Sequence, residues 1–406
     1  MTPLFSDKHP FFTAISLALG SAIALGLARF SYGLLLPVMR EDLSWSYVVA
    51  GSMNTANAVG YLLGALSSPM LMKRMSAAMF FVGASLLTAF LLWLSGATSE
   101  TEWLFLIRVF AGISSAWIFV AGGVLVARLG RMHPQDSGLL LGIYYAGPGL
   151  GIVLSSLIPY FLDHWQQDQA REHAWQLAWY ALGFLAGILA LISNLPIRSI
   201  TAEQAQTTIQ QPSRFITYSP MLAAYFMFGV GYIGYMTFVV ALLAQLGFSE
   251  FILHLFYAIL GLAVMASSRL WAKMLDRFRG GESLAVLNTI LGLACLVPAV
   301  LAFLDIELNL LVTSLIFISG IVFGAVFLSA VASTTAFVKH NMPEQQWVGG
   351  ITVFTSIFAA GQIIGPTVTG WISDGQGGLA QGLILSGCAL LLGGLIALKQ
   401  KPLIEK

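Results

Sequence analysis

Long apolar stretches recur along the whole chain, with short polar segments between them. Each stretch has roughly 20 residues or more, which is enough for an α-helix to cross about 30 Å of hydrocarbon. The pattern predicts about twelve membrane-spanning helices, over residues 11–36, 47–70, 77–96, 104–127, 138–161, 174–195, 221–243, 251–271, 284–304, 308–336, 348–372 and 379–398. We therefore expect an all-α integral membrane protein.

The longest polar stretch between these spans divides the chain into two halves. The predicted parts are an N-terminal six-helix bundle at residues 1–195, a cytoplasmic linker at 196–214 and a C-terminal six-helix bundle at 215–406. The halves also match in sequence, because aligning residues 25–46 with 228–249 superposes Gly26 on Gly229 and Tyr32 on Tyr235. Duplicated halves predict a pseudo-symmetric arrangement, in which a solute binds between the halves near the middle of the membrane.

Composition also places the chain in a lipid bilayer. Only 9% of its residues are charged and 58% are hydrophobic, whereas about 25% of a soluble chain is charged. The net charge of +1 gives no indication of nucleic-acid binding. Cys295 and Cys388 lie in separate predicted spans, so we expect no disulfide, no metal site and no cofactor.

The positions of lysine and arginine predict the orientation. If the N-terminus is cytoplasmic, the cytoplasmic segments and helix ends hold 15 of the 19 Lys and Arg residues, and the opposite loops hold only Arg40 and Arg171. Positive charge is retained on the cytoplasmic side of membrane proteins. We expect a monomeric, multi-pass protein of the cell inner membrane with both termini in the cytoplasm.

The two remaining basic residues, Arg29 and Arg108, fall inside predicted spans. A charge in hydrocarbon costs at least about 2.5 kcal/mol, so such residues are expected to face a polar cavity or a partner. Alternatively, Arg29 lies about 10 Å from the end of its helix and its long side chain reaches the headgroups. No Asp or Glu falls within a span. Two arginines facing a cavity would attract an anion, since a guanidinium binds a carboxylate through two hydrogen bonds.

Other polar residues in the spans are candidates for lining the same cavity. Asn54, Asn57 and Tyr61 share one face of the second helix by their spacing. The further substrate-binding candidates are Tyr32, Tyr232, Tyr235 and Gln362, and His254 with Tyr257 would complete the lining. His254 is also a candidate proton carrier. The alternatives are packing or interface anchoring for the aromatic residues, and a hydrogen-bonded interface histidine for His254.

Four stretches resemble motifs of the major facilitator superfamily of transporters, and the resemblance covers nearly all of the chain. "LIRVFAGISSA" at 106–116 resembles the fourth-helix motif, which implies that Arg108 couples ions to transport. "AKMLDRFRG" at 272–280 resembles the loop motif after the eighth helix, which implies a gating pair of Asp276 and Arg277. "GLARFSYGLLLP" at 26–37 resembles the first helix of the YbfB/YjiJ-like branch.

The fourth stretch, "GIYYAGPGLG" at 142–151, is similar to the fifth-helix Gly-Pro motif common in antiporters of the superfamily. It contains Gly147 and Pro148, and the second half has the matching pair Gly365 and Pro366. A proline removes a backbone hydrogen bond and can bend its helix. A hinge role and simple tolerance are both open for these pairs.

Together these features predict a secondary transporter of a small organic solute that works by alternating access, with an organic anion as the leading substrate class. The resemblance implies proton coupling, so the expected partners are a small-molecule substrate, protons and the lipid bilayer. The alternatives are proton-coupled efflux of lipophilic or cationic compounds and a nontransporting membrane sensor. An enzyme is not expected, because HExxH and nucleophile-elbow motifs are absent from the sequence.

Overall fold

The computed structural model of the chain describes residues 9–166, 173–197, 215–343 and 346–403. Every predicted span is a helix in this structure, which follows from the need to satisfy each backbone polar group internally in lipid. Within the described residues, eleven helices are long and apolar enough to cross a membrane, and the predicted second span is the 26-residue helix α3 (Tyr47–Met72). Most of the predicted linker, from residue 198 to 214, lies outside the described residues.

The chain forms two compact units. Unit 1 comprises Met1–Trp45, Ala56–Gln204 and Ser249–Met265, and unit 2 comprises Ser46–Thr55, Ala205–Phe248 and Ala266–Lys406. The first residues of α3 therefore belong to unit 2, and most of α9 (Glu250–Leu270) belongs to unit 1. Each unit thus includes a helix segment from the other half of the sequence.

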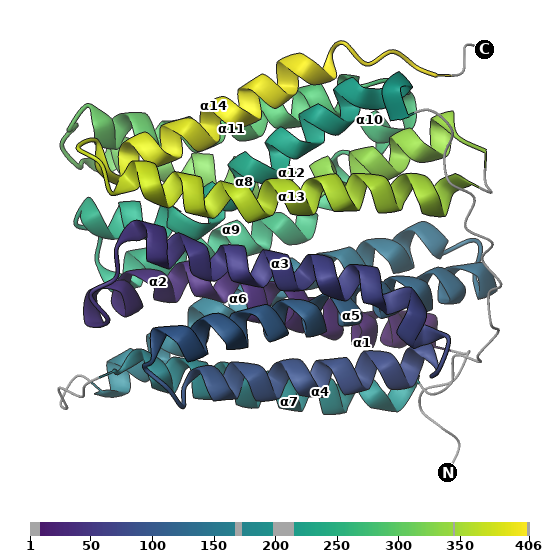
Figure 1. Cartoon of the computed structure of the whole chain (residues 1–406), viewed down its shortest axis with the longest axis horizontal. Helices are drawn as coiled ribbons and strands as arrows, with labels where there is room; N and C mark the ends of the chain where they lie inside the picture. Colours follow the sequence, from purple (N-terminus) through teal and green to yellow (C-terminus); the bar gives the residue numbers. More distant parts are fainter. Residues whose placement is uncertain (1–8, 167–172, 198–214, 344–345, 404–406) are drawn as a thin grey trace. The chain divides into compact units, whose positions relative to one another are not determined.

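Unit 1 is a bundle of apolar helices. Its remaining elements are α1 (Pro10–Ser21), η1 (Ala22–Phe30), α2 (Ser31–Asp42), α4 (Ala77–Ser95), α5 (Thr101–Met132), α6 (Ser137–Gln166) and α7 (Trp175–Ile197). Helix α4 packs against both α5 and α7, and Figure 1 shows α4 and α7 side by side. Helices α5, α6 and α7 all pack against both α1 and η1, so the first span has neighbours from three helices.

Glycine allows the contact between η1 and α6. A Cβ atom added to Gly26 would lie 2.3 Å from the Cα of Gly151. Only two glycines can bring the backbones this close, as in other membrane helix pairs with small residues at the crossing. The crossing brings η1 against α6 at Gly26, three residues before Arg29.

The first predicted span departs from a regular α-helix. Its nine central residues, Ala22–Phe30, form the π-helix η1, and the N–H of Ser31 bonds the carbonyl of Gly26 five residues back. A π-helical turn is uncommon and is frequently found at functional sites. Arg29 lies at the C-terminal end of this π-helix.

Unit 2 is a second helical bundle. Its elements are η2 (Phe215–Tyr218), α8 (Ser219–Gln245), α10 (Ala272–Arg277), α11 (Glu282–Phe303), α12 (Leu310–Asn341), α13 (Trp347–Ser373) and α14 (Gly378–Ala397). Helix α14 packs against both α8 and α11, and α13 packs against α8. Figure 1 shows α11 and α14 side by side.

The beginning of α3 is held in unit 2 by a carboxylate. The two oxygens of Asp374, directly after α13, accept the backbone N–H groups of Tyr47 and Val48 at 2.7 and 2.9 Å. These N–H groups are among those at a helix start that have no partner within the helix. A negative charge there is also favoured by the helix dipole.

Candidate functional site

Arg29 and Arg108 lie inside unit 1, on η1 and α5. Their side chains are 2% and 3% exposed. Among the residues that the structure describes, they are the only buried residues with a formal charge, and no Asp or Glu is buried. The sequence prediction that both arginines lie within helical spans is confirmed, and the local charge of the unit interior is positive.

Aromatic rings and a backbone carbonyl surround the two guanidinium groups. Arg108 donates from Nη1 to the carbonyl oxygen of Ala28 at 2.7 Å, and its guanidinium carbon is 4.8 Å from the ring centre of Tyr32. The guanidinium carbon of Arg29 is 5.5 Å from the ring centre of Tyr61. Each cation–π contact offsets about 0.5–2 kcal/mol of the cost of burial. Because Ala28 precedes Arg29, its hydrogen bond with Arg108 links the two arginines.

Asn57 adds a polar group to the same cluster. Its Nδ2 donates to the backbone oxygen of Arg108 at 3.3 Å. Its Oδ1 is fully buried and has no hydrogen-bond partner within the described part of the chain. Buried acceptors are nearly always hydrogen-bonded, so we expect a water molecule or a solute to donate to this oxygen. The Arg29 cluster, defined as Arg29, Tyr32, Asn57, Tyr61 and Arg108, therefore combines positive charge with an available acceptor.

The predicted residues Tyr232 and Gln362 meet in unit 2. Gln362 donates from Nε2 to the hydroxyl of Tyr232. The Tyr232 ring stacks with those of Phe228, Phe327 and Phe358, at centroid distances of 4.9, 5.0 and 5.4 Å. These residues come from α8, α12 and α13. They form an aromatic cluster whose polar groups are the Tyr232 hydroxyl and the Gln362 amide.

The other two predicted lining residues also make contacts within unit 2. The ring of Tyr235 stacks on Phe323 with 4.0 Å between centroids. Asn54 donates from Nδ2 to Oγ1 of Thr237 at 2.7 Å. Asn54 and Asn57 share one helix face, yet their side chains hydrogen-bond in different units.

The residues predicted to couple or gate transport are scattered through the structure. His254 of α9 is 2.6 Å, through Nδ1, from the carbonyl oxygen of Ser156 on α6. Asp276 and Arg277 lie exposed on α10. Their coupling and gating roles stay predictions.

The glycines of the two Gly-Pro pairs lie at close helix crossings. A Cβ atom on Gly147 would be 2.2 Å from the oxygen of Ala18, and one on Gly365 would be 2.5 Å from the oxygen of Val230. Helices α6 and α13 continue through Pro148 and Pro366. Close packing therefore explains the glycines, while a hinge role for the prolines stays a prediction.

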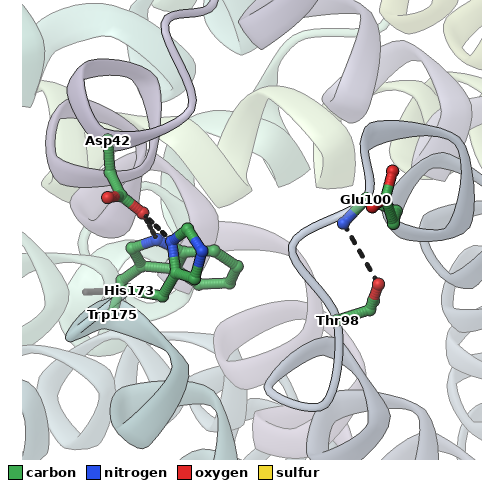
Figure 2. Close-up of polar contacts among 5 residues, drawn as sticks. All are labelled: Asp42, Thr98, Glu100, His173 and Trp175. Carbon is green, nitrogen blue, oxygen red and sulfur yellow. Dashed lines mark hydrogen bonds and ion pairs between the residues drawn. The ribbon is translucent and has the colours of Figure 1, made fainter. Parts of the chain in front are cut away.

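A cluster that the sequence analysis did not identify lies at the end of α2. One carboxylate oxygen of Asp42 is 2.5 Å from both His173 Nδ1 and Trp175 Nε1, as Figure 2 shows. The same view shows the N–H of Glu100 donating to Thr98 Oγ1 at 3.1 Å, just before α5. The separation of 131 residues between Asp42 and His173 gave no sequence signal of their contact.

The chain matches known transporters along nearly its whole length. The sequence model of the family described as "Uncharacterised MFS-type transporter YbfB" matches residues 21–398. A bacterial homologue of the human lysosomal transporter Spinster, in an inward-facing and unoccupied conformation, is 17% identical over 97% of this chain and 98% of that chain, with a TM-score of 0.69. The nucleoside transporter NupG is 17% identical over 96% of this chain and 100% of that chain, also with a TM-score of 0.69. At these identities, the two structures indicate a common fold.

Proposed function

We propose that this chain, which belongs to the YbfB family of transporters in the major facilitator superfamily, carries a small organic anion across the cell membrane by alternating access. The Arg29 cluster is the observation that carries the anion assignment. Two cationic side chains are buried there, whereas no Asp or Glu is buried in the described residues. A transported anion would balance this charge during the transport cycle.

The geometry of arginine suits a carboxylate. A guanidinium presents its N–H donors in a planar fork that matches two carboxylate oxygens. Hydrogen bonds between two charged groups are roughly twice as strong as neutral ones. A carboxylate would therefore compete well with the rings of Tyr32 and Tyr61 for the guanidinium groups. The Oδ1 of Asn57 would accept a hydrogen bond from a hydroxyl or amine on the same solute.

Proton coupling is the second part of the proposal. It rests on the resemblance of the Arg108 segment to a coupling motif, and on His254 as the candidate proton carrier, since histidine is a common proton shuttle. We expect an inward proton gradient to drive anion accumulation in proteoliposomes. Equal uptake with and without the gradient would contradict coupling and leave anion transport intact.

One observation favours a second candidate, the efflux of lipophilic cations. The aromatic cluster around Tyr232 offers stacked ring surfaces and a hydroxyl. Rings of this kind bind flat apolar or cationic compounds. The buried positive charge of the Arg29 cluster argues against a cation in unit 1, so we rank this candidate second.

A ligand screen followed by flux measurements tests the proposal. The purified protein is heated with a panel of carboxylates and a panel of lipophilic cations, since a ligand raises stability with the logarithm of its concentration. We expect carboxylates to raise the melting temperature and the best of them to enter proteoliposomes. Stabilisation by cations alone would favour the second candidate, and binding without flux would favour a sensor.

A further inference from the structure

We propose that Tyr257 is a positioning residue for the anion site and acts by fixing the backbone beside Arg29. Tyr257 is fully buried on α9, and its hydroxyl donates to the carbonyl oxygen of Phe30 at 2.6 Å. On the other side of Arg29, Arg108 donates to the carbonyl oxygen of Ala28. The two residues that flank Arg29, Ala28 and Phe30, thus each have a backbone carbonyl that accepts a hydrogen bond from a side chain of another helix.

Several side chains donate to backbone carbonyls where the π-helix η1 ends and α2 begins. A π-helix pairs groups five residues apart, so the hydrogen-bond ladder is interrupted where it returns to the α-helical spacing. At this junction the carbonyl of Leu27 accepts from Oγ of Ser31, that of Ala28 from Arg108 and that of Phe30 from Tyr257. The bonds from Arg108 and Tyr257 therefore connect this junction to α5 and α9, two other helices of unit 1.

This arrangement has a consequence for Arg29. Its side-chain direction is set by the backbone of η1, which would relax toward regular α-helical spacing if the junction were not held. Any such change of register rotates the residues around it relative to the ring of Tyr61 and to Arg108. Tyr257 would therefore affect the anion through Arg29, without contacting the anion. The inference rests on the proposed function only for the statement that Arg29 binds an anion.

Unit 1 offers a matched control in Tyr144. Its hydroxyl donates to the carbonyl oxygen of Phe119 at 2.7 Å, and its side chain is fully buried like that of Tyr257. Tyr257→Phe and Tyr144→Phe remove the same phenol–carbonyl bond and leave the ring. Only the first of these bonds lies at the π-helical junction, so a general loss of stability would affect both variants.

Two measurements on the full-length protein test the positioning role. Hydrogen–deuterium exchange is followed in peptides covering residues 22–31, and the rate of Arg29 modification by phenylglyoxal is followed by mass spectrometry. In Tyr257→Phe we expect exchange in this segment to be about three- to ten-fold faster, as loss of one hydrogen bond implies. Arg29 modification should also change, while Tyr144→Phe should match the parent in both measurements at residues 22–31.

Equal exchange and equal Arg29 reactivity in Tyr257→Phe and the parent would overturn the inference. So would equal changes in Tyr257→Phe and Tyr144→Phe, because they would indicate a general structural effect. Adding benzoate or succinate separates the two proposals. If Tyr257→Phe loosens the segment but neither carboxylate protects Arg29 in the parent, the positioning role stands and the assigned anion chemistry fails.

Discussion

At the scale of single residues, the structure shows how two positive charges are accommodated in an apolar bundle. Arg108 faces the ring of Tyr32 and a helix carbonyl, and Arg29 faces the ring of Tyr61. These contacts replace part of the hydration that a guanidinium loses on burial. A bound anion would add charge-assisted hydrogen bonds to them.

The contribution of the Asp42 carboxylate to the stability of the protein can be measured. Replacing Asp42 by alanine removes the acceptor for the indole N–H of Trp175, a residue that is 2% exposed. An unpaired buried donor costs about 1–3 kcal/mol, so we expect Asp42→Ala to melt at a lower temperature. The neighbouring exposed Glu41 supplies the control. If Glu41→Ala and Asp42→Ala melt alike, the contact contributes nothing specific.

Sequence spacing predicted some of these residues and missed others for a physical reason. The sequence predicts that Asn57 and Tyr61 share one helix face, because residues four apart are neighbours on a helix surface. Both then join the Arg29 cluster. The same face also carries Asn54, whose partner Thr237 is distant in sequence. Helical spacing predicts which face of its helix a side chain occupies. Which residue it contacts depends on how the helices pack against one another.

At the scale of elements, hydrophobic length alone predicted the spans, because the bilayer sets how many apolar residues a helix needs. The π-helix η1 could not be predicted in this way. It receives hydrogen bonds from Arg108 and Tyr257 and crosses α6. All three are tertiary contacts, and none leaves a periodic signal in residues 11–36.

The crossing of η1 with α6 gives a prediction at this scale. Gly26→Ala places a methyl group 2.3 Å from the Cα of Gly151, so one helix must shift. Overpacking of this kind costs about 1–3 kcal/mol, and we expect a lower melting temperature and weaker anion stabilisation. Gly83→Ala on α4 is the control, since no atom lies within 4 Å of its added Cβ. Parental behaviour of Gly26→Ala would show that the helices move apart freely.

At the scale of the whole molecule, the orientation in the membrane is still a prediction from the Lys and Arg positions. A reporter inserted at Gln206 should be active only if it functions in the cytoplasm, and one at Gln167 only if it functions outside. Both positions lie outside the described residues. Reversed activity at both sites would place the termini on the opposite side of the membrane.

The proposed transport of an anion depends on its binding by Arg29. The most direct test is uptake by proteoliposomes of the best-stabilising carboxylate and of tetraphenylphosphonium, comparing the parent with Arg29→Gln and Arg29→Lys. We predict that Arg29→Gln folds but loses carboxylate uptake, since the site loses a charge and a bidentate donor. Arg29→Lys, which restores only the charge, should recover little. Parental carboxylate uptake by Arg29→Gln, or tetraphenylphosphonium uptake that rises when the charge is removed, would contradict binding of a transported anion by Arg29.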